Sequence, residues 1–326
     1  MERQFVVVRG GWDVVAYYKC RTQKKCSHPK RTMHRSIDID DFIFTGKGML
    51  RLQNHKTEIK DVYNNKADYH QLIKDFQNEI NDLQRVMYAH DRHSLLLIFQ
   101  AMDAAGKDGT IRTIMSGVNA HGLAVHAFKR PSDEELDHDF LWRTSKRLPQ
   151  RGRIGIFNRS YYEEVLVVRV HPEVLRSGQK LPTERTENLA EVWEQRYESI
   201  RDFEKHLSRN GTRVLKFFLH LGRDEQRDRF LARIDEPEKN WKFSEADVKE
   251  RGYWDQYQEA YEDAINATAT KHSPWFIVPA DDKKNMRLIV AQIVLEQLRA
   301  LDMHYPEVTA ERREEMQCYR ERLQED

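Results

Sequence analysis

The sequence has few cysteines, no long apolar run and almost no net charge. Cys20, Cys26 and Cys318 are the only cysteines among 326 residues, too few for a disulfide framework, so a reducing cytoplasm is the expected compartment. The longest purely apolar run near the start covers residues 5–8. It is too short for a signal-peptide core or a membrane span, so we expect no membrane association.

The net charge of +1 argues against a protein that binds nucleic acid or acidic membranes through its overall charge. Hydrophobic residues make up 39% and charged residues 33% of the chain, which indicates a globular protein with a highly charged surface. The length suits one large α/β domain with an insertion, or two domains.

Basic residues nevertheless gather in two segments. Residues 1–40 are basic and show little apolar periodicity, so we expect a mobile basic extension there. Residues 141–160 hold six basic side chains and no acidic one: Arg143, Lys146, Arg147, Arg151, Arg153 and Arg159. This second segment either binds a polyanion or is an ordinary solvated helix end and loop.

Apolar runs alternate with helical periodicity along the middle of the chain. Runs typical of buried strands cover residues 95–99, 123–128, 154–157, 214–219 and 275–278, and amphipathic helices are expected over 68–90 and 188–207. The alternation predicts a parallel sheet covered on both faces, with ligands at the carboxyl ends of its strands. A charged, partly helical insert covers residues 223–273.

The first predicted strand runs directly into a phosphate-binding loop. Gly106 and Lys107 open a helix there, where backbone N–H groups converge on an anion and the lysine adds a point charge. In the usual G-x-x-x-x-G-K-[ST] pattern, Ala101 would replace the first glycine and Asp108 the hydroxyl residue that holds Mg²⁺. Asp103, inside the loop, is therefore the candidate metal ligand.

The strand predicted over residues 154–157 ends in polar and cationic residues. Asn158 and Arg159 would lie beside the phosphates in a P-loop kinase. The simpler interpretation is a strand-to-helix turn with Ser160 as its N-cap. Both interpretations can hold together, because the cap would fix the helix while Asn158 and Arg159 point into the cleft.

Five ordered motifs resemble those of polyphosphate kinase family 2. They are residues 99–111 (FQAMDAAGKDGTI), 128–131 (FKRP), 138–143 (HDFLWR), 158–163 (NRSYYE) and 235–243 (DEPEKNWKF). The resemblance covers roughly residues 56–303. It is strongest to the branch often called class III, which phosphorylates AMP and ADP from polyphosphate and has asparagine at the position of Asn158, where other branches commonly have aspartate.

The resemblance implies a P-loop kinase-like, three-layer α/β/α fold with a parallel five-stranded sheet. The domain would cover residues 41–303 with a helical lid at about 223–273, followed by a charged C-terminal helix or tail over 304–326. The implied reaction is reversible, in-line transfer between inorganic polyphosphate and AMP or ADP, assisted by Mg²⁺ or Mn²⁺. Purine nucleotides and polyphosphate would be the partners, without nucleic acid, and the chain would form a homo-oligomer, a dimer or tetramer.

The resemblance also assigns roles to individual residues. Lys107 would neutralise the transferred group, Asp103 would orient the acceptor phosphate and the metal, and Arg159 would bridge donor and acceptor. Glu164 is either a second metal carboxylate or a charge on a helix face. The remaining expected substrate contacts are Ala104, Ala105, Gly106, Asp108, Gly109, Thr110, Lys129, Arg130, Arg143, Lys146, Asn158, Arg229 and Arg233.

Two other functions are compatible with parts of this pattern. An ATP-dependent nucleotide kinase of the thymidylate or adenylate kinase type would use the loop, but the basic stretch and Asp103 favour a polymeric donor. A non-enzymatic polyanion-binding protein would need the basic stretch but not Asp103 with Lys107 at a strand end. Such binders usually interleave aromatic and basic residues, whereas residues 141–160 contain only Trp142 and Phe157 as aromatics.

Overall fold

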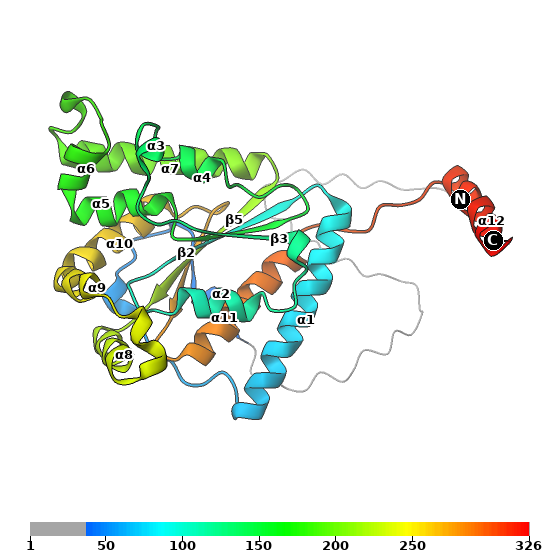
Figure 1. Cartoon of the computed structure of the whole chain (residues 1–326), viewed down its shortest axis with the longest axis horizontal. Coiled ribbons are helices and arrows are strands. Elements are labelled where there is room, and N and C mark those ends of the chain that lie inside the picture. Colours follow the sequence, from blue (N-terminus) through cyan, green and yellow to red (C-terminus); the bar gives the residue numbers. More distant parts are fainter. Residues whose placement is uncertain (1–36, 326) are drawn as a thin grey trace, which may run out of the picture. The chain divides into compact units, whose positions relative to one another are not determined.

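A six-stranded sheet forms the centre of the computed structural model, which describes residues 37–325. The basic extension predicted over residues 1–40 therefore lies almost entirely outside the described residues. The strand order is β1-β6-β5-β2-β4-β3, and helices cover both faces (Figure 1).

The five predicted strands are present and mutually parallel. They are β2 (Ser94–Gln100), β3 (Leu123–Ala127), β4 (Ile154–Asn158), β5 (Thr212–His220) and β6 (Trp275–Pro279). The predicted count of five omitted β1 (Ile43–Phe44), an edge strand antiparallel to β6. A two-residue strand has no apolar run by which the sequence could reveal it.

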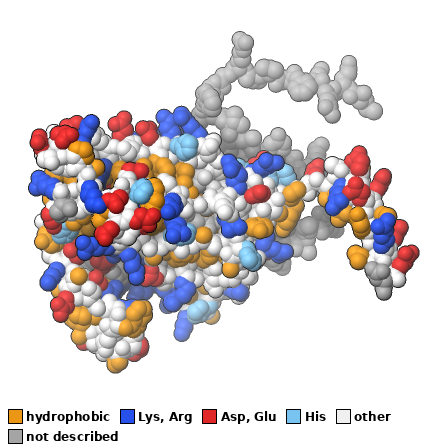
Figure 2. Space-filling view, turned by 45° about the horizontal axis from the view of Figure 1, so that its top comes forward, with side chains coloured by type: hydrophobic (Ala, Val, Ile, Leu, Met, Phe, Trp, Pro, Cys, Tyr) orange, Lys and Arg blue, Asp and Glu red, His pale blue; other side chains and the backbone are white. Residues whose placement is uncertain are grey.

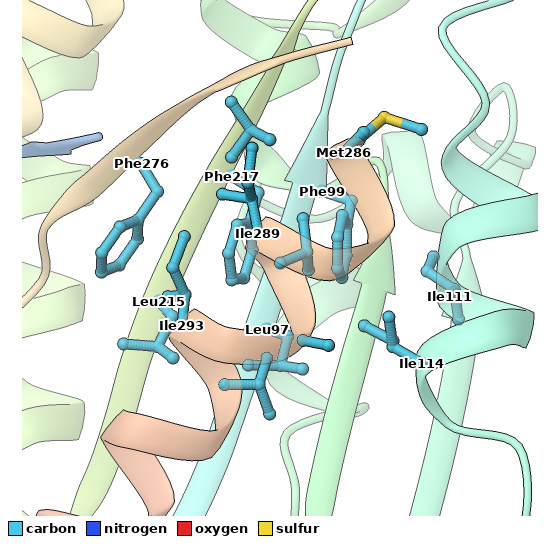
Figure 3. Packing of buried hydrophobic residues seen from close by; sticks show 14 of the residues in the cluster. Leu97, Phe99, Ile111, Ile114, Leu215, Phe217, Phe276, Met286, Ile289 and Ile293 are labelled. Atoms are coloured by element: carbon cyan, nitrogen blue, oxygen red, sulfur yellow. The ribbon is translucent and has the colours of Figure 1, made fainter. Parts of the chain in front are cut away.

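One face of the sheet is covered by α1 (Lys66–His90), α2 (Lys107–Ile114) and α11 (Lys283–Arg299). Ile289 and Ile293 of α11 pack against Leu97 of β2 and against Phe217 of β5 (Figure 3). The other face is covered by α7 (Leu189–Arg209) and α10 (Trp254–Thr268), which enclose a second core containing Leu96. Because both faces are buried, every residue of β2 is buried, as the unbroken apolar run predicts.

The two long predicted helices begin at asparagine caps. The side chain of Asn65 accepts hydrogen bonds from the first turn of α1, and that of Asn188 accepts one from the N–H of Glu191 in α7. After α7 the chain turns through Asn210 and Gly211, where φ of Gly211 is +85°.

Shorter helices connect these elements. The α-helices are α3 (Asp133–Leu136), α4 (Trp142–Ser145), α5 (Val167–Val170) and α6 (Pro172–Gly178). The 3₁₀ turns are η1 (Ile39–Asp41), η2 (Leu52–Asn54), η3 (Ala120–Gly122), η4 (Tyr161–Val165) and η5 (Thr183–Arg185).

The insert between β5 and β6 is helical, as predicted. It contains α8 (Arg223–Asp235), η6 (Pro237–Lys242), α9 (Glu245–Glu250), η7 (Arg251–Tyr253) and α10. One face of α10 is buried in the second core, so the end of the insert belongs to the body of the protein. After α11, helix α12 (Ala310–Glu325) has no buried residue. No helix in the described part of the chain is long and apolar enough to cross a membrane.

Candidate active site

The carboxyl ends of β2 and β4 bring the two main sequence motifs together. These strands are parallel neighbours, with Phe99 beside Asn158. The backbone N–H of Arg159 donates a 3.1 Å hydrogen bond to the carbonyl oxygen of Phe99, so the start of the phosphate loop and the residue after β4 are held side by side. The predicted cluster of Asp103, Lys107 and Arg159 forms because of this register.

The loop after β2 makes a tight turn into α2. Ala104 and Gly106 have φ values of +64° and +100°, and Gly106 is the N-cap of the helix. Nζ of Lys107 donates a 2.9 Å hydrogen bond back across the loop to the carbonyl oxygen of Ala101. The N–H groups of the first turn of α2, which includes the predicted contacts Asp108, Gly109 and Thr110, thus begin directly beside a lysine ammonium.

Arg159 pairs with Asp103. Nη2 of Arg159 lies 2.9 Å from Oδ1 of Asp103, and both side chains remain partly exposed. The neighbouring strand end is tied to α2, because Nδ2 of Asn158 donates a hydrogen bond to Oδ1 of Asp108. These two pairs and Lys107 are five of the predicted residues, and the structure brings them together.

The charges in this cluster influence each other strongly. Burial lowers the pKa of Lys107, and the Arg159 guanidinium lowers it further. Burial also disfavours the charged form of Arg159, but the carboxylates of Glu163 and Asp103 outweigh it and raise the pKa of the guanidinium. Burial raises the pKa of Glu163. An anionic substrate would relieve the mutual repulsion of the two cations.

Two cavities meet at the cluster. The loop cavity, of about 240 Å³, is lined by Asp103 and by residues of the insert, including Asp247. The side cavity, of about 520 Å³, combines basic residues with an apolar wall that includes Phe128 and Phe140. Both are lined by Arg159, Glu163, Val167 and Glu250, so Arg159 lies where they join.

Arg229 supports the loop between β2 and α2. It is buried, and its guanidinium donates to the carbonyl oxygens of Ala104 and Ala105 on one side and of Ala280 and Asp281 on the other, at 2.8–3.0 Å. Its remaining donor, Nε, bonds to Glu225 at 2.7 Å. All five N–H donors of this predicted substrate ligand are therefore used within the protein, and they join the loop to the end of β6.

The other predicted arginine of the insert, Arg233, also has protein partners. Its Nη1 donates to Oδ2 of Asp247 at 2.7 Å and to the carbonyl oxygen of Lys242 at 3.2 Å. Asp247 in turn faces the loop cavity, where burial, followed by the nearby Asp103 carboxylate, raises its pKa. Arg233 thus orients an acidic side chain toward Asp103.

The predicted basic contacts separate into two groups. Lys129 and Arg130 are exposed at the side cavity, and Arg143 lies beneath them, where it donates to the carbonyl oxygen of Lys129 at 2.7 Å. Lys146 does not line either cavity, and its ammonium lies 4.0 Å from the ring centre of Trp142. Figure 2 shows one face on which basic, acidic and apolar side chains are mixed, in line with the small net charge.

The predicted metal ligand Glu164 is engaged by other protein side chains. Its carboxylate is buried and pairs with Arg196 at 3.1 Å, and it also accepts a hydrogen bond from Gln179. It lines the side cavity but not the loop cavity. Among residues 37–325, no group of three or more His, Cys, Asp or Glu side chains is arranged to hold a metal by itself.

Several residues of the loop cavity were not predicted from the sequence. Asp247, Glu250, Arg251, Tyr257 and Tyr261 come from the insert and lie far from the loop in sequence. Glu163 was not predicted as a site residue, although it ends the motif at residues 158–163 and lies in the first turn of the helix after β4.

Comparisons with known proteins agree with this geometry. The family model described as Polyphosphate kinase 2 (PPK2) matches residues 63–306. An ADP-polyphosphate phosphotransferase of Rhodopseudomonas palustris is 57% identical over 268 residues, covering 82% of this chain and 92% of that protein. An AMP/ADP-polyphosphate phosphotransferase of Meiothermus ruber is 45% identical over 228 residues, covering 70% of this chain and 80% of that protein.

The solved structures include a similar fold. The crystal structure of Polyphosphate Kinase 2 from Arthrobacter aurescens TC1 matches with a TM-score of 0.75 and 37% sequence identity, covering 83% of this chain and 93% of that one. The family model matches most of the described residues, and the relatives above align over most of their own length. The chain therefore belongs to the polyphosphate kinase 2 family.

Proposed function

We propose that this chain transfers a terminal phosphoryl group from inorganic polyphosphate to ADP, to AMP or to both, and that it catalyses the reverse reaction. The observation that carries the proposal is the pairing of Arg159 with Asp103 beside Lys107, at the junction of two cavities. The names of the two relatives support the substrates, and ADP is the acceptor that both names share.

The reaction needs alignment and charge neutralisation rather than a covalent intermediate. We propose that Lys107 exchanges its bond to Ala101 for oxygens of the transferred group, and that Arg159 contacts donor and acceptor phosphates from the point where the cavities join. Asp103 would orient the acceptor phosphate. No proton needs to leave a phosphate acceptor at neutral pH, so no general base is required.

A divalent cation fits the donor set at Asp103. Mg²⁺ prefers oxygen ligands and is commonly held by one or two carboxylates together with substrate phosphates and water. Asp103, with Glu163 and Asp247 lining the same cavity, supplies such oxygens. Bound there, Mg²⁺ or Mn²⁺ would neutralise phosphate charge. We favour Asp103 as the protein ligand over Glu164, whose carboxylate is engaged by Arg196.

The side cavity is suited to a nucleoside along its wall or to polyphosphate at its rim. Its apolar wall would accept a base and sugar, while Lys129 and Arg130 would attract phosphates. We propose that the moving lid is limited to about residues 236–253, because Arg229 joins α8 to the phosphate loop and α10 is packed in the core. Homo-oligomer formation stays a prediction.

The test is a donor and acceptor exchange with purified protein. Polyphosphate and Mg²⁺ would be mixed with AMP, ADP, GMP or GDP, and the nucleotides separated by ion-exchange chromatography. We expect ATP from ADP, and ADP followed by ATP if AMP is accepted. Transfer from ATP to a nucleoside monophosphate without any transfer from polyphosphate would refute the proposal in favour of an ordinary nucleotide kinase.

A further inference from the structure

The segment that carries Arg159 and Glu163 rests on buried polar side chains. Arg159 has φ of +63°, in the left-handed region that residues with a side chain seldom adopt, so the surrounding structure must hold it there. Ser160, Tyr161 and Tyr162, which connect Arg159 to Glu163, are all buried. Their hydroxyl groups therefore need partners inside the protein.

Both tyrosine hydroxyls reach one carboxylate oxygen on α7. The hydroxyl groups of Tyr161 and Tyr162 each donate to Oε1 of Glu204 at 2.9 Å. The other oxygen, Oε2, accepts from Nζ of Lys216 at 2.6 Å and from the hydroxyl of Ser273 at 2.8 Å. With four donors on its two oxygens, Glu204 joins η4 to α7, β5 and the turn before β6.

The charges of this network are balanced without solvent. Glu204 and Lys216 are 1% and 0% exposed, so each would be costly to bury alone. Burial lowers the pKa of Lys216, and the Glu204 carboxylate opposes that change. Burial and the same carboxylate raise the pKa values of Tyr161 and Tyr162 well above 10, which keeps both hydroxyls as neutral donors.

We infer that Glu204 is a positioning residue for phosphoryl transfer, an inference that rests on the proposed function. Core packing alone would hold the two rings in place. Because both hydroxyls bond to one oxygen of Glu204, they also fix the distance of the backbone between Arg159 and Glu163 from α7, and its orientation. Transfer depends on alignment of the reacting atoms to well under 1 Å, so this network acts on turnover through Arg159 although Glu204 itself lines neither cavity.

Tyr161→Phe tests the inference most cleanly. Among residues 37–325 the Tyr161 hydroxyl bonds only to Glu204, whereas that of Tyr162 also contacts Thr268 and Lys216. The ring and its packing remain. We expect kcat, normalised to folded protein, to fall about tenfold, with KM for ADP and for polyphosphate changed less than about twofold.

Tyr197→Phe is the matched control. Tyr197 lies on α7, the helix that carries Glu204, and is as buried as Tyr161. Its hydroxyl accepts a 2.6 Å hydrogen bond from Arg169 outside the network. We expect it to lower Tm without lowering kcat. If Tyr161→Phe also lowers Tm but keeps wild-type kcat, the network is merely structural and the inference is overturned.

Failure of the proposed function would be seen separately, as wild-type protein that makes no ATP from polyphosphate and ADP. If Tyr161→Phe does not fold, Tyr162→Phe gives the same comparison, because it removes the other hydroxyl from Oε1 of Glu204. Normal kcat in that folded variant would equally overturn the inference.

Discussion

Nη2 of Arg159 donates a 2.9 Å hydrogen bond to Oδ1 of Asp103, so a cation and an anion of the candidate site are paired before any substrate binds. The pair keeps the guanidinium over the loop instead of letting it extend into solvent. In the proposed mechanism an incoming phosphate would compete with Asp103 for Arg159, and a divalent cation would compete with Arg159 for Asp103. Both exchanges become favourable when nucleotide and metal arrive together.

Asp103→Asn should abolish most transfer and leave the fold intact. The amide keeps the shape of the side chain but not its charge, which we expect to cost ~3 kcal/mol or more of transition-state stabilisation, about 10²-fold in rate or greater. Initial rates of ATP formation and circular dichroism would be compared with those of Asp75→Asn, an exposed change on α1. Near-normal turnover would remove Asp103 from the mechanism.

Lys107→Met should be almost inactive, and Lys107→Arg should not restore activity. Nζ of Lys107 lies 2.9 Å from the Ala101 carbonyl oxygen inside a tight loop, where a planar guanidinium does not fit. The measurement is kcat/KM for both substrates at saturating Mg²⁺. Recovery of most activity with arginine would indicate that only a general positive charge is needed.

Arg229→Lys should lower both stability and activity although it keeps the charge. An ammonium has three donors and cannot replace the five hydrogen bonds of the guanidinium, so we expect a loss of about 2–4 kcal/mol in the free energy of unfolding. Chemical denaturation would measure it. Arg227→Lys, on the exposed face of the same helix, should change neither quantity. Equal effects of the two variants would contradict the loop-supporting role of Arg229.

Replacing Lys129 and Arg130 by alanine should weaken polyphosphate binding and flatten its salt dependence more than it affects ADP. Each lost polyanion contact lowers the salt slope by ~0.7, by analogy with single-stranded nucleic acids. Initial rates against polyphosphate concentration at several salt levels would measure this. Lys146→Ala provides the contrast, since Lys146 lies over Trp142 outside both cavities. A larger effect of Lys146→Ala would instead make Lys146 the main polyphosphate contact among these three basic residues.

His220→Phe should reduce the loss of stability in acid. Burial lowers the pKa of His220 from 6.5 to about 4, so between these values the unfolded chain binds a proton that the folded protein does not. Stability is therefore lost as the pH falls from about 6.5 towards 4, by about 3 kcal/mol from this group. Phenylalanine cannot titrate. Urea unfolding at pH 7 and pH 4.5 would measure the free energy of unfolding of both proteins. The wild type should lose more of it than the variant on going to pH 4.5, and an equal loss in both would show that His220 does not cause the acid sensitivity.

Much of the fold can be predicted because buried parallel strands are continuous apolar runs. All five runs became strands, and the amphipathic helix predicted over residues 188–207 is α7. The edge strand β1 could not be predicted, because two residues carry no periodicity. The packing of α10 was equally hidden, since its sequence shows an amphipathic helix but not the surface on which its buried face lies.

The candidate site divides in the same way. Asp103, Lys107 and Arg159 follow strand ends that a parallel sheet must bring to one edge, so local motifs reveal them. Arg229 and Asp247 lie in a charged insert, where composition cannot distinguish a ligand-binding side chain from a structural one. The burial of Arg229 and its carbonyl partners, which only the folded chain reveals, decide that question.

The left-handed backbone of Ala104 and Arg159 has a consequence for directed evolution of this protein. Glycine adopts such a conformation without the steric cost of about 1 kcal/mol that a side chain carries, so the backbone at both positions favours glycine. A library screened only for heat resistance would therefore tolerate glycine at position 159 and lose the guanidinium that we propose contacts both substrates. Screens for more thermostable variants therefore need to measure turnover in every round.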